Sequence, residues 1–401
     1  GQSIRQSEEI SPSVVIAELL DALDKVVDFG DRDNRPILAK DVLVQSQSLH
    51  PFAVDNFTGG QLPRSFSSDH CLAARALVFP DKQILPFVNS SIPLSTDSLE
   101  GISLVDLIRF FESPSKYFLV NCLGMSLWED DPPPQDHEPM SLNNLEKYGV
   151  KNRLLGMALT PEPEINFHAL EKAKGSLPPG SLGEVWFNEA AIEVDQFMER
   201  WGDALVGKYA PPALLEGIIS GLKIRGEVVS VLNGKQVLYR CGATRPKDRL
   251  SAWIKHLFAC AFLPLDSLET RFFAMDKAKK YLSFEPIPED QSKELLSKLI
   301  EVFQEGMLRP IPFFPASSHA YAKELLNGEG PVTEELKDGA VKKARQEWEP
   351  SSFSHGGPKE GESAENLTCF RDDPIGHPAF AHLAQEVFGP LLDHQREEKE
   401  L

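Results

Sequence analysis

The sequence predicts an α/β protein with α+β character, and three observations support this class. Residues 223–261 read as a strand, a tight turn, a second strand and an amphipathic helix. An apolar stripe with helical spacing runs from Val14 to Leu23 and is followed by a strand-like segment. No internal repeat of fixed period is present, which argues against a solenoid or propeller. A chain of 401 residues that is 41% apolar is long enough for two or three domains with their own cores.

The first region, residues 1–98, is expected to open with a helix. Pro12 and Ser13 precede the apolar stripe, and Pro or Ser at this place is typical of a helix N-terminus. The helix should extend to about Val27 and lead through a turn-rich segment into a strand at residues 41–46. This region therefore reads as the last α/β unit of a larger sheet domain. Because the chain has no initial Met, we expect it to be a piece of a longer protein.

The second region, residues 99–401, begins with a further helix. Ser103 precedes apolar residues with helical spacing from Leu104 to Phe111, and Pro114 should break or restart this helix. Residues 128–136 form an acidic run with three prolines and are expected to be a loop. Residues 337–371, rich in Gly, Ser, Glu and Lys, offer little to bury and are expected to form a mobile loop.

Residues 223–261 carry the most information about function. Asn233 and Gly234 tolerate the positive φ of a hairpin turn, so they should join a strand ending near Val231 to a strand over residues 236–240. Apolar residues from Leu250 to Ala261 share one helical face, which should pack on the sheet. A metal-dependent nuclease site is usually built on such a frame, but the residues that would perform the chemistry are missing.

Composition limits the possible partners and cofactors. A net charge of −19 and a pI near 5.0 argue against wrapping nucleic acid by bulk charge, so any DNA contact should be local or made within an assembly. Five scattered cysteines without a C-x-x-C pair suggest reduced thiols and a cytoplasmic location. No apolar run approaches the ~20 residues of a membrane span. No G-x-x-x-x-G-K motif is present, so no nucleotide cofactor is expected.

The chain resembles a known family along nearly its whole length. The resemblance rests on several segments that follow one another in the same order as in that family: residues 3–6, 12–20, 50–57, 104–118, 138–148, 177–184, 306–307, 343–348 and 388–392. They are similar to the C-terminal part of the gamma subunit of exodeoxyribonuclease V, the RecC family of the RecBCD helicase-nuclease.

The resemblance implies both a fold and a role. Residues 1–98 would be the end of an inactive helicase-like α/β domain, and residues 99–401 a restriction-endonuclease-like, PD-(D/E)XK domain with a degenerate active site. Members of this family neither hydrolyse ATP nor cut DNA. They hold a RecB-type helicase-nuclease subunit and a RecD-type helicase subunit together, and they split and guide DNA strands in double-strand break repair and homologous recombination.

The catalytic residues of an active nuclease of this fold can be compared with this chain one by one. A two-metal nuclease needs carboxylates around its cations and a lysine near the attacking water. Where the active pattern has a helical His, this chain has Glu184, and where it has the metal-binding Asp of the first strand, Val229 stands. The Asp-Tyr-Lys of the second strand aligns with Tyr239 to Cys241. We therefore expect no catalytic residue and no bound metal.

Two alternatives to an inert site stay open at this stage. Glu184 and Glu227 could form a divergent metal-dependent nuclease, although an exposed strand Glu most often faces solvent. Basic side chains also concentrate on this unit and could meet a DNA backbone or an acidic partner, with a solvated face as the simpler interpretation. They are Arg225, Arg240, Arg245, Lys247, Arg249 and Lys255.

Overall fold

The structure, a computed structural model, gives two compact units that are described separately, residues 1–84 and 85–401. The sequence placed this boundary later, at residue 98. Phe87 and Val88 pack against a small cluster around Phe118 and Cys369, and so belong to the C-terminal unit. The structure describes residues 13–32, 35–44, 48, 50–58, 65–79, 87–88, 101–125, 140–160, 166–264, 267–276, 279–328, 332–350 and 358–399.

The N-terminal unit contains short helices and one two-stranded ribbon. Helix α1 (Val14–Val26) confirms the predicted opening helix, although none of its residues is buried within this unit. Strands β1 (Asp31–Arg32) and β2 (Arg35–Pro36) pair antiparallel. Helices α2 (Ala39–Leu43), α3 (Asp55–Thr58) and α4 (Ser68–Val78) complete the described part.

The strand predicted at residues 41–46 is wrong for the residues that the structure describes. Helix α2 ends at Leu43, and Asp41 stabilises its start by accepting a hydrogen bond from the backbone N–H of Leu38 at 3.3 Å. Ala39 is fully buried, and its backbone N–H donates to Asp24 of α1. These local contacts favour a helical turn over the extended conformation that the Val-Leu-Val run suggested.

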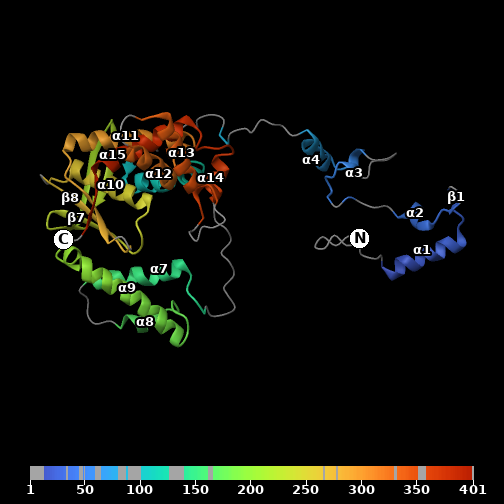
Figure 1. Ribbon diagram of the computed structural model, residues 1–401, viewed down its shortest axis with the longest axis horizontal. Coiled ribbons are helices and arrows are strands. Elements are labelled where there is room, and N and C mark those ends of the chain that lie inside the picture. The colour runs from blue at the N-terminus through green and yellow to red at the C-terminus, as the bar shows by residue number, and fades with distance from the viewer. Residues whose placement is uncertain are drawn as a thin grey trace. The chain divides into compact units, whose positions relative to one another are not determined.

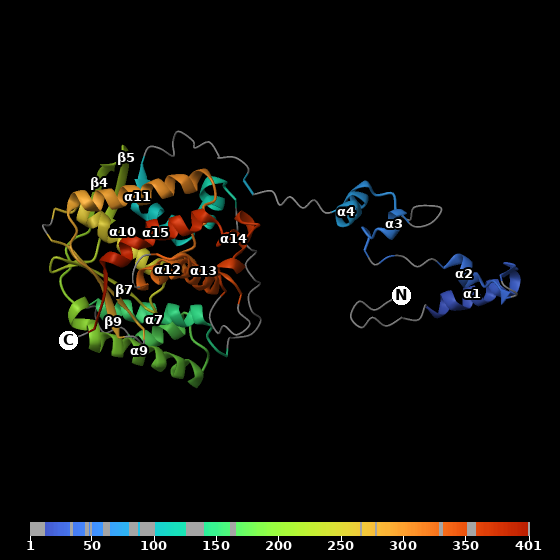
Figure 2. The same cartoon turned by 45° about the horizontal axis from the view of Figure 1, so that its top comes forward.

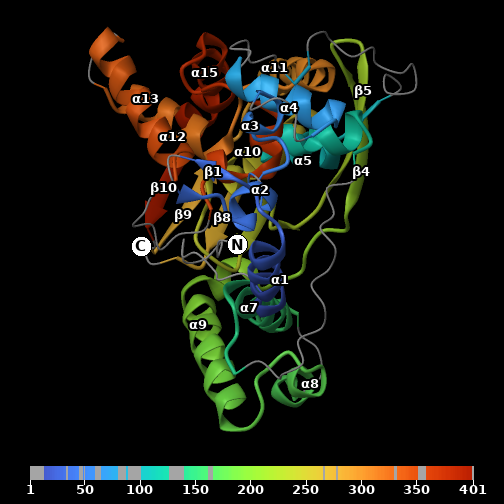
Figure 3. The ribbon, with the colours of Figure 1, turned by 90° about the vertical axis from the view of Figure 1, so that its right-hand side faces the viewer.

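The C-terminal unit is mixed α/β and is built around two small sheets. One sheet has the order β3-β5-β4 and the other the order β10-β9-β8-β7-β6. The strands are β3 (Ile102–Ser103), β4 (Ala213–Ile219), β5 (Leu222–Val228), β6 (Val231–Leu232), β7 (Lys235–Arg240), β8 (Glu269–Ala274), β9 (Lys280–Phe284) and β10 (Gln395–Lys399). The β3–β5 and β7–β8 pairs are parallel and the other pairs are antiparallel. Figure 3 shows the long ribbon of β4 and β5.

The predicted hairpin at Asn233 and Gly234 is confirmed, but its first strand is shorter than expected. Both residues have positive φ, and the turn joins β6 to β7. Ser230 also has a positive φ, of 61°, which interrupts the extended chain after Val228. Strand β5 therefore pairs with β4 and β3 in one sheet, whereas β6 and β7 belong to the other sheet.

Helix α10 (Pro246–Phe262) is more central than its sequence pattern indicated. It contacts helices α5, α11, α12 and α15 as well as both sheets, and Trp253, Leu257 and Phe258 are fully buried. Helix α5 (Leu104–Glu112) lies against it and begins as predicted, since the side chain of Ser103 accepts a hydrogen bond from the N–H of Asp106. The predicted restart is α6 (Pro114–Tyr117), followed by a π-helical turn, η2 (Phe118–Cys122).

The remaining helices surround this centre (Figures 1 and 2). Helices α7 (Asn144–Leu159) and α9 (Ser181–Leu205) pack side by side with α8 (Phe167–Ala173) against α9. Helices α12 (Pro315–Asn327), α13 (Glu334–Trp348) and α15 (Pro378–His394) form a second group next to α11 (Glu289–Leu308). The C-terminal unit thus covers its sheets with helices from distant parts of the chain.

The mobile loop predicted at residues 337–371 is wrong for most of the described residues. Helix α13 extends to Trp348, and η3 (Glu360–Glu362) and α14 (Ala364–Cys369) follow. Ala340 and Ala344 of α13 are fully buried against α12, which explains the error, because two alanines in a run of charged residues give a weak apolar signal. Residues 351–357, and the loop predicted at 128–136, lie outside the described residues.

Candidate functional site

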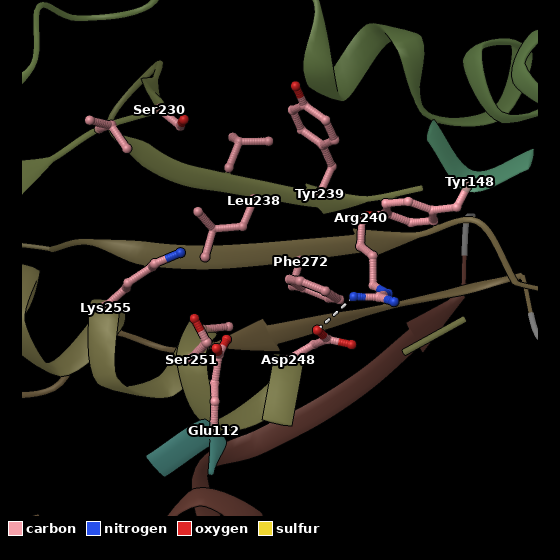
Figure 4. A pocket seen from close by; sticks show the side chains of 13 residues that line it. Glu112, Tyr148, Ser230, Leu238, Tyr239, Arg240, Asp248, Ser251, Lys255 and Phe272 are labelled. Carbon is pink, nitrogen blue, oxygen red and sulfur yellow. Dashed lines mark hydrogen bonds and ion pairs between the residues drawn. The ribbon is translucent and has the colours of Figure 1, made fainter. Parts of the chain in front are cut away.

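A cleft of about 420 Å³ opens where the two sheets meet helix α10. Its walls come from the chain just after β5, from β7 and from the first half of α10, with single residues from α5, α7 and β8 (Figure 4). The lining residues are Glu112, Tyr148, Val229, Ser230, Val237, Leu238, Tyr239, Arg240, Asp248, Ser251, Ala252, Lys255 and Phe272.

The cleft brings together two of the positions predicted to mark the lost chemistry. Val229 reaches it because β5 leaves its sheet one residue earlier, and Tyr239 reaches it from β7. The side chain of Val229 is apolar, and the phenol of Tyr239 is 41% exposed. Neither can give a divalent cation the carboxylate oxygens that it prefers.

The other predicted positions do not line the cleft. Cys241 follows β7 but is buried in a separate apolar cluster with Trp201 and Phe273, and burial raises the pKa of its thiol to about 11. Glu184 is exposed in the first turn of α9, about 25 Å along that helix from Trp201, where the helix meets this cluster. Glu227 is exposed on β5, opposite Leu214. The two glutamates of the alternative nuclease hypothesis are thus not brought together in this cleft.

Two carboxylates that the sequence reasoning missed do line the cleft. Glu112 is the last residue of α5, and Asp248 lies in the first turn of α10. The oxygens of Asp248 accept hydrogen bonds from Arg240 at 2.8 Å and from the backbone N–H of Arg245 at 2.9 Å. Asp248 could have been found as the third residue of the helix that begins at Pro246, a position that favours a capping acid.

The carboxylate of Asp248 is therefore already engaged by arginine and backbone donors. A cation entering the cleft would have to compete with these contacts, and Glu112 alone is a poor ligand set for Mg²⁺. Within the ranges that the structure describes, no group of three or more His, Cys, Asp or Glu side chains is arranged to hold a metal ion.

The six predicted DNA-binding residues lie on β5, on β7 and in or next to helix α10, and three of them are engaged in ion pairs. Arg240 and Arg245 share Asp248, and the guanidinium of Arg240 also lies 5.5 Å from the centre of the Tyr148 ring. Arg249 forms an ion pair with Glu397 of β10 at 3.0 Å. Arg225 is exposed on β5, and Lys247 lies half-buried in the first turn of α10. Of the six, Arg240 and Lys255 line the cleft.

Lys255 differs from the other basic residues in its surroundings. Burial lowers the pKa of its ammonium, while the charges of Glu112 and Asp248 act in the opposite direction. Neither carboxylate comes within ion-pair distance of it, and no other described residue forms a hydrogen bond or ion pair with its ammonium. Figure 4 shows Lys255 projecting from α10 into the hollow, apart from the Arg240–Asp248 ion pair.

The C-terminal unit is a mixed α/β domain with a cleft between its sheets and helix α10. Comparison with known proteins gives the family to which this domain belongs. The RecC C-terminal domain family model matches residues 99–326, and the chain belongs to this family. The match covers α5 to α12, and hence all the elements that form the cleft. Among the described residues, no helix is both long and apolar enough to cross a membrane.

Individual relatives agree with this assignment. The chain is 25% identical over 355 residues to the RecBCD enzyme subunit RecC of Escherichia coli, which covers 86% of this chain and 30% of that protein. It is 25% identical over 362 residues to the RecC subunit of Mycobacterium tuberculosis, covering 89% of this chain and 31% of the relative. For Haemophilus influenzae RecC the identity is 24% over 357 residues, with 82% and 30% covered. The chain spans about a third of the length of these curated relatives.

Proposed function

We propose that this chain is the C-terminal part of a RecC-type subunit and acts without catalysis in a RecBCD-type complex. The observation that carries the proposal is the family membership, together with relatives that are all RecC subunits and match most of the chain. In this role it holds a RecB-type helicase-nuclease subunit and a RecD-type helicase subunit, and helps to split and guide DNA during double-strand break repair and recombination.

In this proposal the C-terminal unit has a restriction-endonuclease-like fold whose role is structural and not catalytic. The support is local: a strand, a hairpin and a helix surround a cleft whose lining includes Val229 and Tyr239, the residues that the sequence predicts at the positions of metal-binding carboxylates. The acids nearest to the cleft do not restore that arrangement, because Asp248 is paired with arginines. The N-terminal unit would be the end of the helicase-like domain.

The absence of catalysis is tested with linear DNA. The chain, incubated with double-stranded or single-stranded DNA and Mg²⁺ or Mn²⁺, should release no more acid-soluble nucleotide than a buffer control. Cleavage that is lost in a Glu184→Ala or Glu227→Ala variant would overturn the proposal in favour of a divergent nuclease.

Assembly is tested separately from catalysis. The full-length subunit that contains this chain should co-purify with the RecB-type and RecD-type subunits of the same organism. Deletion of residues 99–401 should reduce that recovery, because the proposed role assigns contacts with the partner subunits to this part of the chain. Complete recovery of the complex with the deleted subunit would contradict the proposed scaffold role.

A further inference from the structure

Strand β4 lies at one edge of the three-stranded sheet, and none of the described residues pairs with its outer side. The sheet has the order β3-β5-β4, and every residue of β4 is paired with a residue of β5. No backbone hydrogen bond joins β4 to any other described segment. Alternate N–H and C=O groups of an edge strand point away from the sheet, so this edge can pair with a further strand.

The outward face of β4 carries two aliphatic side chains that its own fold leaves in solvent. Leu214 is 82% exposed and Ile218 is 72% exposed, and Glu216 lies between them on the same face. The opposite face of the strand is packed, since Leu215 and Ile219 contact the main apolar core. A strand with one packed face and exposed aliphatic side chains on the other is suited to a contact with another polypeptide.

The other three sheet edges in the described part of this unit are protected against strand addition. Strands β3 and β6 are each two residues long, and β10 carries charged side chains at positions 396–399. Short strands and charged side chains keep a sheet edge from pairing with another chain. Strand β4 has seven residues and one acidic side chain, Glu216, which forms an ion pair with Lys223 of β5 at 2.9 Å. Strand addition is therefore favoured at β4 over the other edges.

The side chains of β4 define the segment that would fit this edge. Residues on paired strands lie opposite one another on the same face, so the added strand should carry apolar side chains opposite Leu214 and Ile218. The side chain of Glu216 is 64% exposed despite its ion pair, so a Lys or Arg opposite it completes the match. The fitting segment is thus extended, with the pattern apolar-x-basic-x-apolar.

A second copy of this chain fits the edge less well. If two copies of β4 paired antiparallel with Leu214 opposite Ile218, Glu216 would lie opposite the same residue of the other copy, and like charges directly opposite each other are destabilising. The net charge of −19 adds repulsion between two copies. The pattern therefore favours a different polypeptide, which supplies the basic residue.

We propose that β4 is a docking edge that receives an extended segment of a partner subunit as an additional strand. Main-chain hydrogen bonds would provide the pairing, and contacts with Leu214 and Ile218 would select the segment. The inference rests on the proposed function, which supplies the partner subunits. It goes further in naming the surface, the conformation of the bound segment and its side-chain pattern.

Hydrogen exchange measured by mass spectrometry tests the pairing directly. The full-length subunit that contains this chain is compared alone and in complex with the RecB-type and RecD-type subunits, and peptides that cover residues 213–219 are followed. The outward amides of β4 should exchange fast in the free subunit and at least about tenfold more slowly in the complex. Unchanged exchange would overturn the proposal. Slow exchange already in the free subunit would show that the subunit covers this edge itself, and would also overturn it.

Lysine substitution tests the side-chain contacts. Leu214→Lys combined with Ile218→Lys places charges on the edge and should weaken assembly with the partner subunits at least about tenfold. Ile192→Lys is the matched control, because Ile192 is an equally accessible aliphatic residue, 55% exposed, on helix α9. It should change assembly by less than about twofold. Equal effects of the double variant and the control, or no effect of the double variant, would contradict the proposal.

Stability separates a lost contact from a lost fold. Because Leu214 and Ile218 are exposed, the thermal unfolding midpoint of the double variant should stay within about 2 °C of wild type. If the double variant does not fold, Glu216→Lys provides the second test, since it opposes the expected basic residue and should weaken assembly at least about threefold. Undiminished assembly of Glu216→Lys would count against the proposal. If the wild-type subunits assemble and the β4 variants assemble equally well, the inference fails while the proposed function stands.

Discussion

Gly226 of β5 lies where two helices approach the strand most closely, and its replacement by Ala gives a direct test of the packing that frames the cleft. A Cβ at this position would lie 2.6 Å from Cβ of Leu104, 2.9 Å from its Cδ2 and 3.0 Å from Cζ of Phe258. Carbon atoms in favourable contact are about 3.5–4.0 Å apart, so the new methyl group is about 1 Å too close to both side chains.

The cost of Gly226→Ala follows from which atoms can move. Cβ of Leu104 is fixed to the backbone of α5, so a rotamer change cannot relieve the contact and the helix itself must shift. Overpacking of this kind costs about 1–3 kcal/mol, and the benefit of replacing a strand glycine offsets at most about 1 kcal/mol. We expect the free energy of unfolding to fall by about 1–2 kcal/mol.

Tryptophan fluorescence during guanidinium denaturation measures this change in the right unit. All five tryptophans, at positions 128, 186, 201, 253 and 348, lie in the C-terminal unit. Gly339→Ala in α13 is the matched control, because a Cβ there meets no atom within 4 Å and Ala favours a helix, so it should raise stability by about 0.5–1 kcal/mol. Gly226→Ala that is as stable as wild type would refute the close approach of α5 and α10 to β5.

The remaining predictions concern pH and a buried ion pair. Burial lowers the pKa of His256 to about 4, so the stability that the neutral imidazole contributes should be lost as pH falls from about 6.5 toward 4. In this pH range the free energy of unfolding should change more steeply with pH in wild type than in His256→Gln, by an amount that corresponds to the uptake of up to about one proton on unfolding. Equal slopes in the two proteins would contradict this. Glu171 of α8 is fully buried; burial acts to raise its pKa, but the hydrogen bond and charge of Arg153 outweigh this and lower the pKa. Glu171→Gln should therefore cost about 2 kcal/mol, less than a fully buried pair because Arg153 is 41% exposed. Because the pKa of Glu171 is lowered in the folded state, the stability that this contact contributes should be lost as pH falls below the ordinary range of a glutamate carboxyl. Hydrogen exchange of the α8 amides measures this loss, and unchanged protection in the variant would count against it.

The local elements were largely predictable, because their signals are local. The Asn233-Gly234 turn, the helix after Pro246 and the start of α5 at Ser103 each depend on residues within a few positions of one another. The errors occurred where a local pattern was weak. Buried Ala340 and Ala344 were hidden in a charged run, and Ser230, whose positive φ separates β5 from β6, carries no strong turn signal.

The candidate site was only partly predictable, because a cleft is made of residues that are distant in the sequence. Reading along the pattern placed Val229 and Tyr239 at the lost chemistry, and both line the cleft. Glu112 could not be assigned there, since nothing local connects the end of α5 to the hairpin. Glu184 was placed near the site by motif order, but it lies near the far end of a helix of 25 residues.

The sequence by itself determined the family resemblance, the Asn233-Gly234 turn and the helix after Pro246, because these depend on residue identity and short spacing. Only the tertiary structure decided which charges meet. It paired Arg240 with Asp248 and Arg249 with Glu397, and it left the ammonium of Lys255 facing an open cleft. Electrostatic energy depends on distance and solvent exposure, and neither can be read from the order of residues along the chain.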